Sequence, residues 1–320
     1  MQINSQYTPK IYFHKTHFEP NSTNLKLKPQ LQYDTVSFSG NCNFLNLPCN
    51  LTLKKIKDAI SNPEYFLGKG SEARVYRIPD TEYCVRISHL DNDYVEGPLK
   101  FISLDKNLNE ADKINHTVAK FGKKSSILHY LEGEPLSTHK TTAEKVIENT
   151  QKISEMPIES FQKLFKQICH AYKNNMMFDH CHQNVIFNQK DKTITAIDFY
   201  KNEYGVILKP LSYIYDSLIP YRSLNEQRKV IAGKIINAGI NELEPRVKPC
   251  YPVTNFDFER LLLFLEYREN YSLDHKLMES LTKKIDKIVK LKIKELEGQN
   301  VKVKLEANIK EARNLIKQIF

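Results

Sequence analysis

The 320-residue sequence lacks any cysteine pattern that marks a metal centre. It contains no Cys-x-x-Cys pair and no cluster of cysteine with histidine at the spacing of zinc ligands. Scattered cysteines of this kind are typical of reduced thiols in the cytosol. The pattern therefore argues against a zinc site and predicts free thiols at Cys42, Cys49, Cys84, Cys169, Cys181 and Cys250.

The sequence also lacks a long apolar run. A helix that spans a bilayer needs about 20 mainly apolar residues, and no stretch of this chain provides them. Residues 1–10 have no apolar core of the kind that a secretory signal needs. We therefore expect no transmembrane segment and a cytoplasmic location. Export by a dedicated secretion machine leaves no cleavable signal, so an exported effector is the alternative expectation.

Residues 1–50 lack a sustained hydrophobic period and are rich in Asn, Gln, Ser, Thr and Pro. A segment with this composition buries too little apolar surface to offset the entropy lost on ordering. We predict a disordered or loosely ordered polar tail there. The first expected helix follows at residues 52–62, where apolar residues recur at helical spacing and Asn62-Pro63 provides a stop.

The sequence also has no excess of acidic residues. It contains 47 Lys and Arg and 38 Asp and Glu, so its net charge is +9. This balance suits an anionic partner such as a nucleotide, a nucleic acid or a membrane surface. Residues 271–320 hold 12 basic and 7 acidic residues, which accounts for more than half of the net charge. Since the acids are interleaved and no aromatic stacking pattern accompanies the lysines, we interpret this segment as solvated helix faces and expect no strong nucleic-acid interaction.

The strongest signal for chemistry lies in residues 177–200. Asp179 is followed five positions later by Asn184, and two β-rich runs joined by a polar turn then lead to Asp198. A hairpin brings its two ends together, so these three side chains are expected to converge. An amide and a carboxylate can hold Mg²⁺ while a free acid accepts the proton of an attacking hydroxyl. The alternative is ordinary turn chemistry around a surface hairpin.

A second signal is a glycine pair between two β-rich runs at residues 65–78. Glycines let backbone N–H groups approach phosphate oxygens without a side chain in the way. A plain β-hairpin is the alternative for this segment. The residues expected to surround the phosphates are Gly68, Lys69, Gly70, Ser71, Ala73 and Val75.

Together these segments resemble the motifs of the protein-kinase-like fold. Asp179 and Asn184 are similar to its catalytic base and its metal-binding asparagine, and Asp198-Phe199 is similar to its Asp-Phe-Gly metal motif. Residues 68–75 are similar to its glycine-rich loop, with alanine in the place of the third glycine. The resemblance implies ATP and Mg²⁺ as cofactors, with Asn184 and Asp198 as the metal ligands.

The sequence departs from the protein-kinase motifs in two respects, and these departures indicate which branch of the fold it resembles most. His182 within the loop and Tyr200 in place of the motif's glycine are closer to the aminoglycoside-phosphotransferase and choline-kinase-like branch. The chain also has no long activation segment and no Ala-Pro-Glu motif after Tyr200, which argues against a protein kinase switched by loop phosphorylation.

Further roles follow from the resemblance alone. Arg86 stands where protein kinases usually place a phosphate-binding lysine on the third strand. The candidate partner that would hold it is Glu110, in a helix expected between residues 104 and 116, and Glu96 is the alternative. Tyr130 and Leu131 fall in the linker whose backbone groups would contact adenine. The predicted catalytic set is therefore Asp179, Arg86 and Glu110.

The expected fold class is α+β: a two-lobed, protein-kinase-like fold with a small antiparallel β N-lobe and a helical C-lobe. The predicted divisions are a tail at residues 1–50, an N-lobe at 51–132 and a C-lobe at 133–320 with extra C-terminal helices. Helices are expected at residues 142–154, 157–174, 224–238, 256–267, 273–296 and 301–319.

The sequence is consistent with three alternative functions. The first is an ATP- and Mg²⁺-dependent phosphotransferase that moves the γ-phosphoryl group to a hydroxyl of a protein or a small molecule. The second is a pseudokinase or nucleotide-binding scaffold without turnover, which Arg86, Ala73 and Tyr200 favour. The third is a helical adaptor whose basic C-terminal helices are the working surface. Neither the acceptor nor the oligomeric state follows from the sequence.

Overall fold

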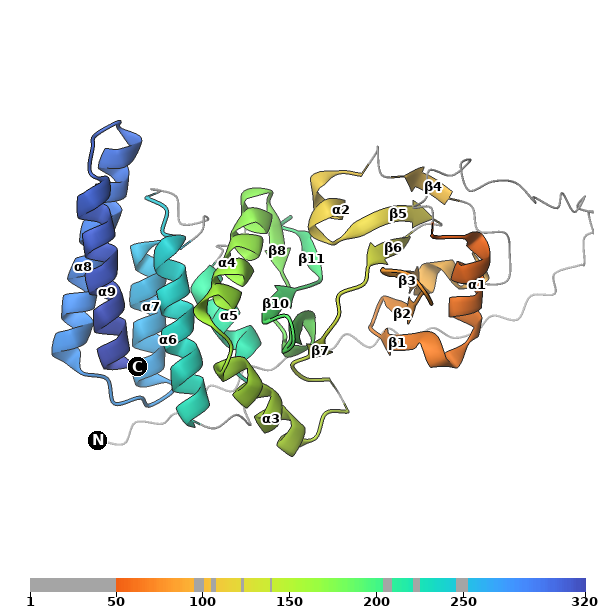
Figure 1. Cartoon of the computed structure of the whole chain (residues 1–320), viewed down its shortest axis with the longest axis horizontal. Helices are drawn as coiled ribbons and strands as arrows, with labels where there is room; N and C mark the ends of the chain where they lie inside the picture. Colours follow the sequence, from red (N-terminus) through yellow and green to blue (C-terminus); the bar gives the residue numbers. More distant parts are fainter. Residues whose placement is uncertain are drawn as a thin grey trace, which may run out of the picture. The chain divides into compact units, whose positions relative to one another are not determined.

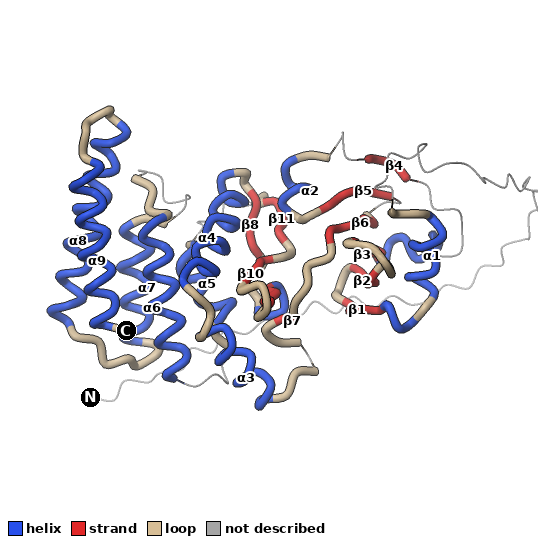
Figure 2. Tube along the Cα trace, in the orientation of Figure 1, coloured by secondary structure: helices blue, strands red, loops and turns tan. Residues whose placement is uncertain are grey.

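The computed structural model describes residues 50–94, 101–104, 108–121, 124–138, 140–203, 209–220, 225–245 and 253–320. The predicted polar tail lies outside these residues, except for Asn50. The described residues belong to one compact unit and combine an antiparallel sheet with helices, which confirms the α+β class (Figures 1 and 2). Free thiols are present at the described cysteines Cys84, Cys169 and Cys181.

The first part of the unit is a six-stranded antiparallel sheet in the order β1-β2-β3-β6-β5-β4. Gly68 lies in β1, Gly70 lies in the turn from β1 to β2, and Arg86 lies on β3, so the predicted motif segments occupy neighbouring strands. The strands are β1 (Phe66–Lys69), β2 (Ala73–Arg77), β3 (Tyr83–Ser88), β4 (Phe101–Leu104), β5 (Thr117–Phe121) and β6 (Ser125–His129).

One helix covers the hydrophobic side of this sheet. Helix α1 (Leu53–Ser61) begins at Thr52, whose hydroxyl accepts a hydrogen bond from the Lys55 backbone N–H at 3.2 Å, and it ends before Pro63. Ile56 and Ala59 of this helix are buried against apolar side chains of the sheet, such as Ile127. This hydrophobic cluster is separate from the larger cluster in the helical part.

Helix α2 (Glu110–Ile114) is short and precedes β5. It begins with a capping box, in which the side chains and backbone N–H groups of Asn109 and Asp112 bond each other reciprocally. It lies within the interval where the sequence predicts a helix, residues 104–116, but Leu104 ends strand β4 instead. The sequence pattern does not predict β4.

The helical part confirms the predicted helices within one to a few residues at each end. Helix α4 lies at its centre and buries Phe161, Leu164, Phe165 and Ile168. Helices α8 and α9 pack side by side as a hairpin (Figure 1). The helices are α3 (Ala143–Ser154), α4 (Ile158–Lys173), α5 (Pro210–Leu218), α6 (Asn225–Asn241), α7 (Asn255–Tyr267), α8 (His275–Leu296) and α9 (Lys302–Ile319).

Short strands connect the two parts and build the candidate site. The predicted hairpin is confirmed, because β9 pairs with β10 in antiparallel register from Val185–Ala196 to Asn188–Thr193. The last strand, β11, pairs with β8 and so returns the chain beside the start of the loop. These strands are β7 (Glu134–Pro135), β8 (Met176–Phe178), β9 (Val185–Asn188), β10 (Thr193–Ala196) and β11 (Phe199–Lys201).

Candidate active site

Asp179 and Asn184 lie in contact at the two ends of the loop between β8 and β9. The Asn184 side-chain amide donates to the Asp179 carboxylate at 3.0 Å and to the Asp179 backbone carbonyl at 3.1 Å. A turn of 3-10 helix over His182–Asn184 sets this spacing. Because the amide nitrogen faces Asp179, the amide oxygen of Asn184 is left to face another ligand.

Asp198 lies beside this pair. The pairing of β11 with β8 sets Phe199 opposite Phe178, and the backbone N–H of Asp179 donates to the backbone carbonyl of Asp198 at 3.3 Å. The structure thus brings together Asp179, Asn184 and Asp198, the three residues that the sequence places at the ends of the hairpin. Asp198 has a φ of +65°, a left-handed conformation that costs free energy for a residue with a side chain.

Two side-chain amides hold the backbone on either side of Asp198. Gln167 of α4 donates to the Ala196 carbonyl at 2.8 Å and accepts from the Ala196 N–H at 2.9 Å. Asn115, just after α2, does the same for Phe199, with distances of 2.7 Å to its carbonyl and 2.8 Å from its N–H. The intervening Ile197 N–H donates to the Asn184 carbonyl at 2.8 Å. These bonds hold the strained residue in place.

The Asp198 carboxyl group is electrostatically perturbed. The residue as a whole is exposed, but its carboxyl group is partly removed from solvent. This desolvation raises the pKa of Asp198 above the ordinary value, and the negative charge of Asp179 raises the pKa further. The positive charge of Arg86 lowers the pKa, and the charge of Glu72 raises it. Arg86 therefore lies close enough to Asp198 for their charges to interact.

The donor atoms of the site are side-chain oxygens, the donor type that hard divalent cations such as Mg²⁺ prefer. Within the described part of the chain, no three His, Cys, Asp or Glu side chains cluster as metal ligands. Asn184 and Asp198 offer one amide oxygen and one carboxylate. Mg²⁺ in nucleotide sites is held by one or two carboxylates together with phosphate oxygens and water, so a small protein donor set is sufficient.

The glycine-rich turn is closed by a hydrogen bond from the Gly70 N–H to the Ala73 carbonyl at 2.9 Å, and space remains beside its two glycines. An added side-chain carbon at Gly68 or Gly70 would meet nothing within 4 Å, and neither residue has a positive φ. The fold itself therefore does not require glycine at these two positions. Lys69 and Ser71 are exposed, Ala73 is buried at the start of β2, and Val75 lies opposite Arg86 on β3.

Arg86 is held by the glycine-rich turn and by the β5–β6 connection. Its guanidinium group lies 3.3 Å from the Glu72 carboxylate and donates to the Lys124 carbonyl at 3.1 Å. The Glu72 side chain is 72% exposed, so this ion pair can exchange with solvent or with another anion. The sequence does not single out Glu72, because a glutamate in a surface turn carries no signal of its own.

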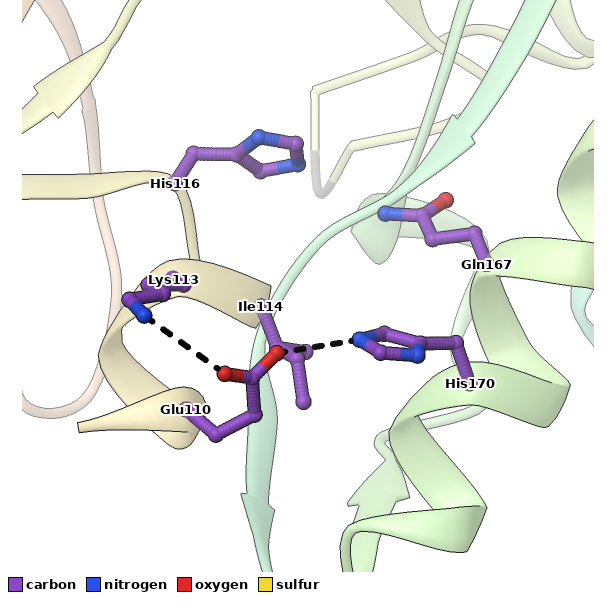
Figure 3. A pocket seen from close by; sticks show the side chains of 6 residues that line it. All are labelled: Glu110, Lys113, Ile114, His116, Gln167 and His170. Atoms are coloured by element: carbon purple, nitrogen blue, oxygen red, sulfur yellow. Dashed lines mark hydrogen bonds and ion pairs between the residues drawn. The ribbon is translucent and has the colours of Figure 1, made fainter.

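The predicted pairing of Arg86 with Glu110 is wrong in this structure. The Glu110 carboxylate lies 3.2 Å from His170 Nε2 and 3.7 Å from Lys113 Nζ (Figure 3). Helix α2 is only five residues long, and its Glu110 faces α4 rather than β3. Glu110 thus joins α2 to α4 and does not hold Arg86. The alternative partner, Glu96, lies outside the described residues.

Glu110 also lines a small pocket of about 210 Å³ beside α2 and α4 (Figure 3). Lys113, His116, Gln167 and His170 line the same pocket. His116 has a φ of +58°, and burial lowers the pKa of its imidazole. Asp179, Asn184 and Asp198 are not among the residues that line this pocket, so we assign it no part in the chemistry.

The linker residues Tyr130 and Leu131 are half-buried. The Tyr130 N–H donates to the Glu82 carbonyl at 2.8 Å, and the Arg77 guanidinium group lies 3.8 Å from the centre of the Tyr130 ring. These contacts fix Tyr130 to β2 and to the turn before β3. A role of this linker in binding adenine stays a prediction.

Helix α5 contacts the loop that carries Asp179 and Asn184. His182 donates from Nδ1 to the Ser217 carbonyl at 3.0 Å, which requires the tautomer with a proton on Nδ1 or the charged ring. His180 stacks on Tyr213 of α5 with ring centres 4.3 Å apart. Burial raises the pKa of Asp216. His180 and His182 lie close enough for their charges to oppose this rise.

The sequence matches no protein-family model, and a search of curated proteins finds no similar sequence. Within the described part of the chain, no helix is both long enough and apolar enough to cross a bilayer.

Proposed function

We propose that this chain is an ATP- and Mg²⁺-dependent phosphotransferase with a two-lobed, protein-kinase-like fold, and that it transfers the γ-phosphoryl group to a hydroxyl of a protein or a small molecule. The observation that carries the proposal is the gathering of Asp179, Asn184 and Asp198 at one point, with Asp198 held in a strained conformation by bonds on both sides. Strain that surrounding bonds maintain is characteristic of functional sites.

In this proposal Asp179 accepts the proton of the acceptor hydroxyl at its carboxylate. Asn184 donates to one Asp179 oxygen at 3.0 Å and so fixes the carboxylate, leaving the second oxygen for the hydroxyl. The amide oxygen of Asn184 and the carboxylate of Asp198 would hold Mg²⁺. The ion would neutralise phosphate charge, which is its usual contribution to phosphoryl transfer.

The phosphate side is formed by the glycine-rich turn and Arg86. No side chain covers the backbone at Gly68 and Gly70, and the Gly70 N–H donates to the Ala73 carbonyl at 2.9 Å, which keeps the turn closed. The exposed Glu72 can yield its place beside Arg86 to a phosphate. A guanidinium group binds phosphate through two parallel N–H donors. Lys69, at the end of β1, is placed to add charge at the same turn.

The architecture supports the kinase-like assignment. An antiparallel sheet carries the glycine pair and Arg86, and a long helix, α4, leads into the strand and loop that carry Asp179. The sheet and the helices have separate hydrophobic clusters, as expected of two lobes. The order of the motifs along the chain is the one that the fold needs.

The first experiment is thermal unfolding with ATP and Mg²⁺, alone and together. We expect the melting temperature to rise only when both are present, and we expect Asp198→Asn to abolish the rise because the amide is a much weaker ligand for a divalent cation. The matched control is Asp58→Asn on the exposed face of α1, which should keep the full shift. An unchanged shift in Asp198→Asn would contradict the metal site.

The second experiment measures ATP turnover with a panel of protein and small hydroxylated acceptors. We expect Asp179→Ala and Arg86→Ala each to reduce turnover at least about 100-fold, the scale of losing a general base or a phosphate-binding group. Turnover that survives in Asp179→Ala would disprove its role as the base.

A nucleotide-binding scaffold without turnover is the second candidate. The observation that favours it is that Arg86 is already occupied by Glu72 and by the Lys124 carbonyl. Binding of Mg²⁺ with ATP that is lost in Asp198→Asn, without phosphate transfer by the wild type to any acceptor, would select this candidate.

A further inference from the structure

Helix α7 carries apolar side chains on two opposite faces. Its inner face buries Phe258, Leu261, Leu262 and Leu265. On its outer face, Phe256 is 53%, Leu263 51% and Tyr267 75% exposed. A helix that is apolar on two faces is usually covered on both, so the outer face has the composition of a contact surface.

The outer side chains follow the spacing of a helix-packing seam. Phe256, Arg260, Leu263 and Tyr267 are separated by four, three and four residues, the alternation that repeats every 3.5 residues in coiled coils. We call these four residues the outer seam. They span 11 steps of the helix, about 16 Å at 1.5 Å per residue, which is enough for about three turns of a second helix.

The outer seam is a stripe rather than a set of scattered exposed residues. Single exposed apolar side chains are ordinary on a protein surface, whereas neighbouring ones mark interaction sites. Leu263 and Tyr267 are adjacent on the helix at a separation of four, and Arg260 fills the gap between Phe256 and Leu263. The inner face already packs on α5 and α8, so these contacts leave the seam to a further element.

Arg260 gives the seam a charge at its centre. It is exposed. Burial raises the pKa of Tyr213 and of Asp257, and the positive charge of Arg260 opposes both shifts, which places it near both groups. Within the described residues, the α7 side chain in a salt bridge is Glu266, which pairs with His275, and Arg260 takes part in none. When a partner covers the seam, the Arg260 charge loses water, and an unpaired buried charge costs free energy. A partner that fits the seam therefore presents an acidic group opposite Arg260.

We infer that the outer seam of α7 docks an amphipathic helix of a protein partner, one that presents apolar residues at heptad spacing and an Asp or Glu opposite Arg260. A second copy of this chain does not meet the requirement. Since Arg260 lies near the middle of the seam, self-pairing through a two-fold axis brings two Arg260 side chains close together in either helix direction. The inference does not rest on the proposed phosphotransferase activity, because it concerns binding alone.

The first test uses two synthetic amphipathic helices of about four heptads that are identical except for one core position, which is Glu in one and Lys in the other. Their binding to the full chain, wild type and Arg260→Glu, is measured by fluorescence anisotropy. We expect the wild type to bind the Glu peptide at least about tenfold more tightly than the Lys peptide, and Arg260→Glu to reverse the preference. Equal affinity in all four combinations overturns the inference.

Two further variants locate the contact. Leu263→Ser should weaken binding of the Glu peptide at least about tenfold, since it removes a central apolar contact. Val230→Ser on α6 is the matched control, because Val230 is also exposed, at 40%, but lies outside the seam, and it should leave the affinity unchanged. Both positions are exposed, so we expect both variants to fold, and circular dichroism verifies this. Equal losses in the two variants contradict a site on α7.

A photoreactive residue at position 263 of the full chain then identifies the natural occupant. A cross-link to a heptad-patterned helix of another protein, whose binding is lost in Arg260→Glu and restored when its acid is changed to Lys, supports the inference. Cross-links confined to a second copy of this chain, or to other segments of the same chain, overturn it.

Discussion

Asp198 adopts a left-handed backbone conformation that few residues with a side chain adopt without support from their surroundings. The support comes from hydrogen bonds to its neighbours Ala196 and Phe199, each held through both its N–H and its carbonyl by one side-chain amide. Such two-point contacts restrict rotation as well as position. At the scale of single residues, the site is therefore organised by Gln167 and Asn115 as much as by its carboxylates.

Replacing Asn115 tests this directly. Asn115→Ala leaves the N–H and the carbonyl of the buried Phe199 without their partner, so we expect unfolding free energy to fall by about 1–3 kcal/mol. If the proposed activity holds, turnover should fall at least about tenfold at saturating ATP, because the ligand at Asp198 loses its position.

The measurements are denaturant unfolding and steady-state turnover. The matched control is Asn174→Ala, because Asn174 is exposed and donates only to the His170 carbonyl at the end of α4. Equal effects of the two substitutions would show that the contact with Phe199 has no special part in the site.

The beginning of α7 shows how an element depends on one buried acid. Thr254 and Asp257 form a capping box, with the Thr254 N–H donating to the Asp257 carboxylate at 3.3 Å. Burial raises the pKa of Asp257 to about 6, although this hydrogen bond and the charges of Lys209 and Arg260 oppose the shift. The capping box provides hydrogen-bond partners for backbone N–H groups at the start of α7, but the Asp257 carboxylate that takes part in it is a buried charge at neutral pH.

The raised pKa predicts a specific dependence of stability on pH. Because the folded state holds this proton more tightly than the unfolded state does, the stability that the protonated group contributes is present below about pH 4 and is lost as pH rises through about 6. Asp257→Asn cannot ionise. We expect it to be more stable than the wild type at pH 7.5, by up to about 2–3 kcal/mol, and to show almost no difference near pH 4.

Urea unfolding at the two pH values measures this difference. Asp58→Asn, at an exposed position on α1, should show no comparable change with pH. A variant Asp257→Asn that is less stable than the wild type at pH 7.5 would mean that the carboxylate contributes more to the cap than its burial costs.

The described unit as a whole is built on two hydrophobic clusters. One lies between α1 and the sheet, and the other lies among the helices and the short strands that carry Asp179 and Asp198. Contacts between the parts include the Asn115–Phe199 and Glu110–His170 bonds. Polar links between separate cores let one part loosen without unfolding the other.

Ile127→Ala tests this separation. Ile127 is fully buried in the sheet cluster, so its truncation should cost about 2–5 kcal/mol and speed amide exchange in the sheet and α1, while α6 and α8 keep their protection. Ile235→Ala, an equally buried change in the helical cluster, should show the reverse pattern. Hydrogen exchange followed by mass spectrometry makes the comparison, and equal acceleration everywhere in both variants would indicate one cooperative unit.

The sequence by itself determined the class of the fold, most of the helices, the hairpin of β9 and β10, and the meeting of Asp179, Asn184 and Asp198. These features follow from short-range physics: the period of apolar residues, the chemistry of caps and turns, and the return that a hairpin imposes on its two ends. They need no knowledge of which distant residues meet.

Only the tertiary structure decided the partners of the side chains. The amides of Asn115 and Gln167 carry no local signal, because their partners at Phe199 and Ala196 lie 84 and 29 positions away along the chain. For the same reason the sequence could not assign Glu110 to His170 or Arg86 to Glu72 and Lys124. Nor could it show that α7 leaves a second apolar face uncovered, because the period that predicts a helix does not say which of its faces the rest of the chain will bury.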